Sequence, residues 1–144
     1  MTEGTVQRMD IDAGAAEIYA VAADLASYTD WAQGVKSVEI LETNDEGLPT
    51  KATFKVDAMM KEITYTLDYE HDVPRLMTWT AIPGDDIREM QGSYEFTDNG
   101  IGTSVVYALR VDPTFSVPGF IRRQAEKTLI GIALRGLKQA TEGG

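Results

Sequence analysis

The chain has 144 residues, a formal net charge of −10, one histidine and no cysteine. Without cysteine there are no disulfides, thiol catalysis or thiolate metal sites, and one imidazole cannot build a histidine cluster, so no metal or cofactor is expected. The acidic balance argues against a nucleic-acid partner, because affinity for phosphates comes from clustered lysine and arginine.

No apolar run reaches the length of about 18 residues that a membrane-spanning helix needs. The first residues show neither the basic start nor the following apolar stretch of a secretory signal. We therefore expect a cytoplasmic protein with no transmembrane segment. At this length it should form one domain over residues 1–144, with a core of useful size.

The first third of the chain predicts one strand and two short helices. Residues 5–12 alternate loosely, as a strand does, and residues 14–23 then switch to helical spacing. A second helical turn is expected after Asp24, and the region ends at Trp31.

From residue 35 onward the hydrophobic period is two, which predicts about six further strands in a meander. The clearest alternation lies in residues 61–71, where Ile63, Tyr65, Leu67 and Tyr69 share one face. Alternation of this kind is typical of an antiparallel sheet with one face in water, so the fold class is α+β. The expected strands are residues 35–42, 50–58, 61–71, 76–82, 87–97 and 103–112.

Residues 117–140 predict one long C-terminal helix, with Ser116 as its cap and Pro118 in its first turn. Its apolar arc is about twice the ordinary stripe of roughly 100°, so we expect the sheet to wrap around it. Small residues on this arc are consistent with either close packing against strands or space for a ligand. The residues expected on the covered side are Ile121, Ala125, Leu129, Ile130, Ile132, Ala133, Leu134, Gly136 and Leu137.

Three phrases resemble the polyketide cyclase/dehydrase and lipid-transport group of the START-like (SRPBCC) helix-grip superfamily, in particular its small single-domain actinobacterial members. They are DLASYTDW at residues 24–31, PRLMTW at 74–79, and GSYEF at 92–96 followed by GTSVVY at 102–107. The resemblance spans residues 6–140, with Thr29 where proline is common. It implies a Bet v 1-like fold: seven antiparallel strands around a C-terminal helix, two short helices between strands 1 and 2, and an apolar cavity.

No residue pattern forms a catalytic signature, so the catalytic residues are unknown. His71 is expected to be a solvated turn histidine, because Asp72 beside it points to the opposite face. Met59 and Met60 are expected at a hairpin tip, where apolar side chains guard a cavity mouth or meet a partner. Inward tyrosines either pack the core or orient the polar end of a ligand.

The leading hypothesis is that the chain binds a small hydrophobic or aromatic, lipid-like molecule between sheet and C-terminal helix. One alternative is a polyketide cyclase or dehydratase in which tyrosines polarise a carbonyl. The other is a protein-interaction module whose surface forms a homodimer, with a filled core and no pocket of roughly 300 Å³ or more. The expected ligand-binding residues are Phe54, Tyr65, Trp79, Tyr94 and Tyr107, above a floor of Ala125, Leu129 and Ala133.

Overall fold

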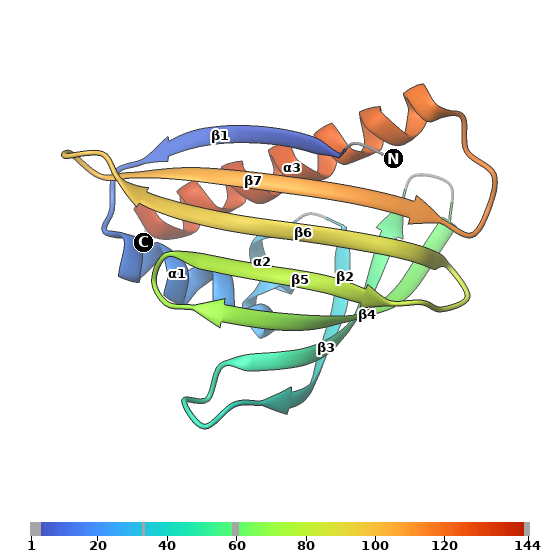
Figure 1. Ribbon diagram of the computed structural model, residues 1–144, viewed down its shortest axis with the longest axis horizontal. Helices are drawn as coiled ribbons and strands as arrows, with labels where there is room; N and C mark the ends of the chain where they lie inside the picture. The colour runs from blue at the N-terminus through green and yellow to red at the C-terminus, as the bar shows by residue number, and fades with distance from the viewer. Residues whose placement is uncertain (1–3, 33, 59–60, 143–144) are drawn as a thin grey trace.

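The computed structural model of the protein describes residues 4–32, 34–58 and 61–142. Its described part forms a seven-stranded sheet with helices on one face (Figure 1). The elements in order are β1 (Thr5–Ile11), α1 (Ala15–Ala23), a 3-10 turn (Leu25–Ser27), α2 (Tyr28–Trp31), β2 (Val35–Thr43), β3 (Pro49–Ala58), β4 (Lys61–Asp72), β5 (Leu76–Ile82), β6 (Ile87–Asp98), β7 (Thr103–Pro113) and α3 (Gly119–Glu142).

The sheet confirms the predicted antiparallel meander. Strands β2 to β7 pair with their neighbours in the chain, and β1 joins the edge at β7, giving the order β1-β7-β6-β5-β4-β3-β2. The predicted strands agree with the observed ones to within two residues. The Met59 and Met60 prediction lies outside the described residues.

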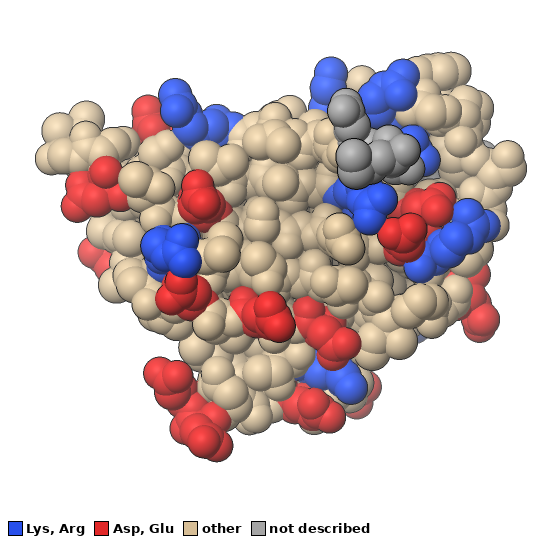
Figure 2. All heavy atoms as spheres, in the orientation of Figure 1, with Lys and Arg blue, Asp and Glu red and all other residues tan. Residues whose placement is uncertain are grey.

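One face of the sheet is exposed to solvent, as the alternating hydrophobicity of the strands predicts. Along β4 from Ile63 onward, and along β5 and β7, every second side chain is buried or half-buried on the inner face. Most of the intervening side chains are polar; the apolar exceptions are Leu76, Ile82, Val106 and Ala108. Ion pairs such as Arg110 with Glu89 and Arg88 with Asp112 join neighbouring strands on the outer face. Figure 2, in the orientation of Figure 1, shows acidic and basic side chains spread over this surface.

Helix α3 crosses behind β1 and β7 and also contacts α1 (Figure 1). Ile130, Leu134 and Leu137 form its buried strip, and each has an exposed fraction of 1% or less. The predicted covered side is therefore wrong in part, because Ile121 and Leu129 are each 39% exposed. The helix is apolar over so wide an arc that its period alone does not fix which strip meets the sheet.

The start of α3 also differs from the prediction. The carbonyl of Pro118 accepts hydrogen bonds from the backbone N–H groups of Ile121 and Arg122, so Pro118 precedes the helix and Ser116 is not its cap. Proline has no N–H to lose at this place, and its fixed φ suits the residue next to a first turn.

A carboxylate lies in the buried strip of α3. Glu126 is 1% exposed and accepts hydrogen bonds from the Thr5 hydroxyl at 2.8 Å and the Val111 backbone N–H at 2.9 Å. The ladder between β1 and β7 begins at the pair Thr5 and Leu109, so Val111 lies beyond it. Glu126 thus satisfies a backbone donor that the β1–β7 ladder leaves open, and it ties α3 to β1 and β7.

Candidate cavity between the sheet and the helices

A cavity of about 100 Å³ lies between the inner face of the sheet, α2 and α3. Its wall is almost wholly apolar and aromatic, as expected where the inner residues of antiparallel strands converge. The lining residues are Tyr28, Trp31, Ala32, Val35, Phe54, Val56, Tyr65, Leu67, Tyr69, Trp79, Met90, Tyr94, Tyr107, Leu109, Leu129, Ile132 and Ala133.

Seven of the eight residues predicted to bind a ligand line this cavity, and the eighth does not. Those on the wall are Phe54, Tyr65, Trp79, Tyr94, Tyr107, Leu129 and Ala133. Ala125 is half-buried but lies one helical turn nearer the start of α3 than Leu129, beyond the end of the cavity. The expected floor is therefore shorter than predicted.

Residues of α2 were missed. Tyr28 and Trp31 form part of the wall, with ring centroids 4.7 Å apart. Both belong to the phrase at residues 24–31, where the sequence predicts a short helical turn that ends at Trp31, and neither is in the predicted set of ligand-binding residues. A helix of four residues gives no periodicity from which its inner face could be predicted.

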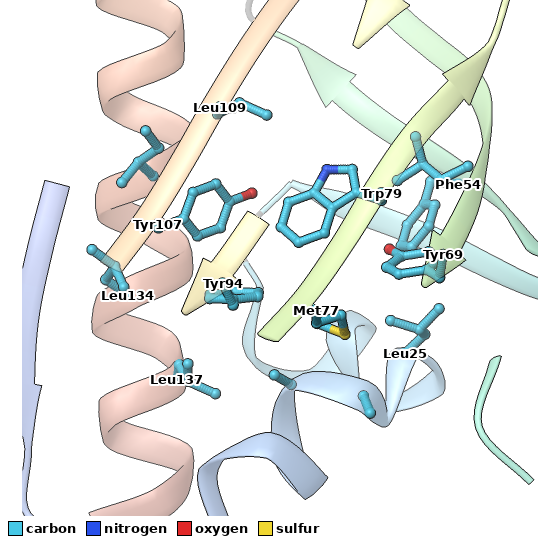
Figure 3. Close-up of a cluster of buried hydrophobic side chains, with 14 of the residues drawn as sticks. Leu25, Phe54, Tyr69, Met77, Trp79, Tyr94, Tyr107, Leu109, Leu134 and Leu137 are labelled. Atoms are coloured by element: carbon cyan, nitrogen blue, oxygen red, sulfur yellow. The ribbon is translucent and has the colours of Figure 1, made fainter. Parts of the chain in front are cut away.

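Trp79 on β5 stands at the centre of the wall, surrounded by tyrosines (Figure 3). Its ring centroid lies 5.8 Å from that of Tyr69 and 5.4 Å from those of Tyr94 and Tyr107. The indole lies directly over Gly92 on β6, where a Cβ atom would come within 2.3 Å of the ring. Gly92 thus makes the room that Trp79 occupies.

Several polar atoms of this wall have no partner within the described chain. Among the tyrosines and tryptophans of the described residues, only Tyr19, Tyr28 and Trp31 make side-chain hydrogen bonds. Every fully buried side-chain nitrogen or oxygen of the described residues does have a partner. The unpartnered atoms must therefore border open space, and for nearly buried side chains that space is the cavity. They are the hydroxyls of Tyr69, Tyr94 and Tyr107 and the indole N–H of Trp79. The Tyr65 hydroxyl also has no partner within the described chain, but its side chain is only half-buried.

These phenols keep their protons. Burial raises the pKa of Tyr69, Tyr94 and Tyr107 well above the ordinary value, and repulsion from neighbouring tyrosines such as Tyr28 raises the pKa of each further. Burial likewise raises the pKa of Tyr65. The hydroxyls can therefore donate hydrogen bonds, but they are poor bases.

The cavity reaches the surface between α2 and α3. Leu129 lines it and is also 39% exposed, and Ile132 and Ala133 beside it are half-buried. On the opposite side Trp31 packs against Gly136 of α3, where a Cβ atom would lie 2.5 Å from the indole ring. This contact holds α2, which carries the lining residue Trp31, against α3 beside the cavity.

His71 lies away from the cavity wall and is not a solvated turn residue as predicted. It belongs to β4 and is half-buried. Its Nε2 lies 2.6 Å from the Pro49 carbonyl, which can only accept, so Nε2 donates; its Nδ1 lies 2.7 Å from the Tyr19 hydroxyl. Burial raises the pKa of Tyr19 to about 12, so this phenol also keeps its proton. Sequence reasoning missed these contacts because Pro49 and Tyr19 are distant in the chain.

The sequence model of one protein family, described as polyketide cyclase / dehydrase and lipid transport, matches residues 2–142. The chain belongs to this family. No curated protein matches the chain. Among the described residues of this polyketide cyclase/dehydrase and lipid-transport family member, no helix has both the length and the apolarity to cross a membrane.

Solved structures share the family member's START-like helix-grip fold. A START superfamily protein from Mycobacterium smegmatis has 16% identity, covers 99% of each chain and gives a TM-score of 0.89. The Zhui aromatase/cyclase from Streptomyces sp. R1128 has 16% identity over 96% of this chain and 93% of its own, with a TM-score of 0.79. A STAR-related lipid transfer protein from Xanthomonas axonopodis has 20% identity over 94% and 84%, with a TM-score of 0.71.

Proposed function

We propose that the protein binds a small hydrophobic or aromatic molecule in the cavity between the sheet and α3. The observation that carries this proposal is an apolar, aromatic concavity that reaches the surface at Leu129. Ligand sites of this kind combine an apolar lining with a few polar groups that fix orientation, and the unpartnered hydroxyls supply such groups here.

The size of the cavity limits the ligand. Its volume of about 100 Å³ is below the range of roughly 300–1,000 Å³ typical of drug-sized ligands. An apolar cavity of about 150 Å³ is known to bind benzene. We therefore expect one ring or a short chain to enter with small side-chain shifts, whereas a larger molecule needs α2 and α3 to separate at Trp31 and Gly136.

The cavity volume is also below the roughly 300 Å³ that the protein-interaction alternative sets as its upper limit. A filled core and a possible homodimer therefore stay predictions until binding is measured. For the cyclase or dehydratase alternative, the wall offers hydroxyls that could polarise a carbonyl but, among the described lining residues, no carboxylate, imidazole or lysine to act as base. The lining favours binding over turnover.

Filling the cavity tests the proposal. Ala133→Phe adds a ring from the α3 side of the wall, and Gln139→Phe adds the same ring at an exposed position of the same helix. Ligand-observed NMR with ethylbenzene should show binding to the wild type and to Gln139→Phe but not to Ala133→Phe. Circular dichroism checks that both variants fold. Equal binding by a folded Ala133→Phe, or none by the wild type, would overturn the proposal.

A further inference from the structure

We propose that the cavity selects uncharged ligands that carry a hydrogen-bond acceptor, such as an aryl ketone, and rejects carboxylates. This inference rests on the proposed function and specifies the chemistry of the same site. It follows from what the polar atoms of the wall can and cannot do.

The cavity presents donors that the protein leaves unsatisfied. The rings of Tyr94 and Tyr107 meet edge to face at a centroid distance of 4.6 Å, and both flank Trp79 (Figure 3). Neither hydroxyl has a partner within the described chain, and neither does the Trp79 N–H. A ligand acceptor placed here takes a hydrogen bond from these donors, which a hydrocarbon cannot take.

An indole N–H can only donate, and this asymmetry sets the preference. The phenols can donate or accept, but Trp79 requires an acceptor opposite it. A carbonyl oxygen has two lone pairs and can take hydrogen bonds from two such donors at once. A pure hydrocarbon of the same shape leaves these donors unsatisfied in its presence, whereas a ketone satisfies them.

The wall holds no charge that could balance an ionic ligand. Among the described lining residues none is a lysine, arginine, histidine, aspartate or glutamate. Burial keeps the pKa of Tyr69 and Tyr94 well above the ordinary value, so no tyrosinate counters a cation near neutral pH. Moving an unpaired carboxylate from water into such a site costs more free energy than hydrogen bonds from the phenols return.

Three single-ring probes of similar size separate the contributions of the ring, the uncharged acceptor and the negative charge to binding. They are ethylbenzene, acetophenone and benzoate. Their dissociation constants are measured by ligand-observed NMR or calorimetry against the wild type, Tyr94→Phe and Tyr107→Phe. Tyr19→Phe is the matched control, because the Tyr19 hydroxyl bonds His71 outside the cavity. Phenyltrimethylammonium tests whether the aromatic faces bind a cation instead.

We expect acetophenone to bind the wild type at least 100-fold more tightly than benzoate. Tyr94→Phe and Tyr107→Phe should each weaken acetophenone about 3- to 10-fold and leave ethylbenzene within about 2-fold. Tyr19→Phe should leave the ratio of the acetophenone and ethylbenzene dissociation constants unchanged. Tighter binding of benzoate or of the ammonium, or an unchanged acetophenone constant in both cavity variants, would overturn the inference.

Stability gives a second readout. Removing a hydroxyl that hydrogen-bonds the protein destabilises the fold, whereas removing one that has no protein partner is neutral or stabilising. Without ligand, Tyr94→Phe and Tyr107→Phe should therefore unfold at the wild-type urea concentration or above it, and Tyr19→Phe below it. If neither ethylbenzene nor acetophenone binds the wild type, the proposed function fails. If either binds but the acetophenone constant shows no dependence on the hydroxyls, only this inference fails.

Discussion

Two strips of α3 face different surroundings. The strip of Glu126, Ile130, Leu134 and Leu137 is buried to 1% or less against β1, β7 and α1. The strip of Leu129, Ile132 and Ala133 is half-exposed and borders the cavity. Both strips are apolar apart from Glu126, so composition does not distinguish them. What differs is whether a neighbouring element fills the space opposite.

The difference separates stability from binding. Tightly packed side chains stabilise the fold through transfer and dispersion, and they leave no room for a guest. The cavity strip forgoes part of that packing and keeps an opening that a ligand can use. Changes on the packed strip should therefore alter stability, and changes on the cavity strip should alter ligand binding.

Alkaline pH gives the largest expected effect, and it acts on the cavity side. Burial raises the pKa of Tyr69, Tyr94 and Tyr107 well above the ordinary value of about 10. Above pH 10 the unfolded chain releases protons that the folded protein keeps, so the free energy of unfolding falls as the pH rises. Below pH 10 these groups contribute their full stability. The expected slope is up to about 1.4 kcal/mol per pH unit for each tyrosine.

Urea denaturation at several alkaline pH values measures that slope. Tyr69→Phe should reduce the slope by the contribution of one tyrosine hydroxyl, because phenylalanine releases no proton. The ultraviolet absorbance of tyrosinate should appear together with unfolding. Ionisation of the buried phenols in a protein that is still folded would contradict the prediction.

Leu134→Ala should destabilise the packed strip by about 2–5 kcal/mol, because the leucine is 1% exposed and its removal leaves a cavity. Thermal or urea unfolding measures the loss. The dissociation constant of ethylbenzene for the molecules that remain folded should stay within about 2-fold, since Leu134 is not among the lining residues. A large change in that constant would show that the two strips are coupled.

Gly92→Ala should lower both the stability and the ligand affinity, because it displaces Trp79 at the centre of the cavity wall. The added Cβ atom would lie 2.3 Å from the Trp79 ring, so the indole must shift into the cavity. Overpacking of this kind costs about 1–3 kcal/mol, and ligand binding should be lost. Gly84→Ala is the control, because its Cβ atom would meet only the Ile82 carbonyl at 3.9 Å. Wild-type binding by Gly92→Ala would refute the position assigned to Trp79.

Much of the fold could be predicted from the sequence because it depends on local periodicity. The alternation in β4 placed Tyr65 and Tyr69 on the inner face, and the structure places both on the cavity wall. The tyrosines of β6 and β7 follow the same rule. In an antiparallel sheet with one wet face, the period of two settles which side chains point inward.

The remaining features depend on contacts between distant residues. Glu126 is buried because Val111 lies just past the end of the β1 ladder, which the helix sequence does not reveal. His71 is held by Tyr19 and Pro49, which are 52 and 22 residues away. The size of the cavity depends on how far α3 and α2 approach, and Gly136 sets that distance by admitting Trp31. Periodicity predicts faces, but it does not predict which faces meet.

The smallest expected effect on stability is that of Leu129→Ala. Leu129 is 39% exposed, so its truncation should cost about 1 kcal/mol or less, well below Leu134→Ala. Its removal widens the mouth of the cavity, and the association and dissociation rates of ethylbenzene, measured from NMR line shapes, should both rise. Lys127→Ala, an exposed change nearby on the helix, should alter neither rate. A loss of stability as large as that of Leu134→Ala would place Leu129 in the packed core and remove the distinction between the two strips.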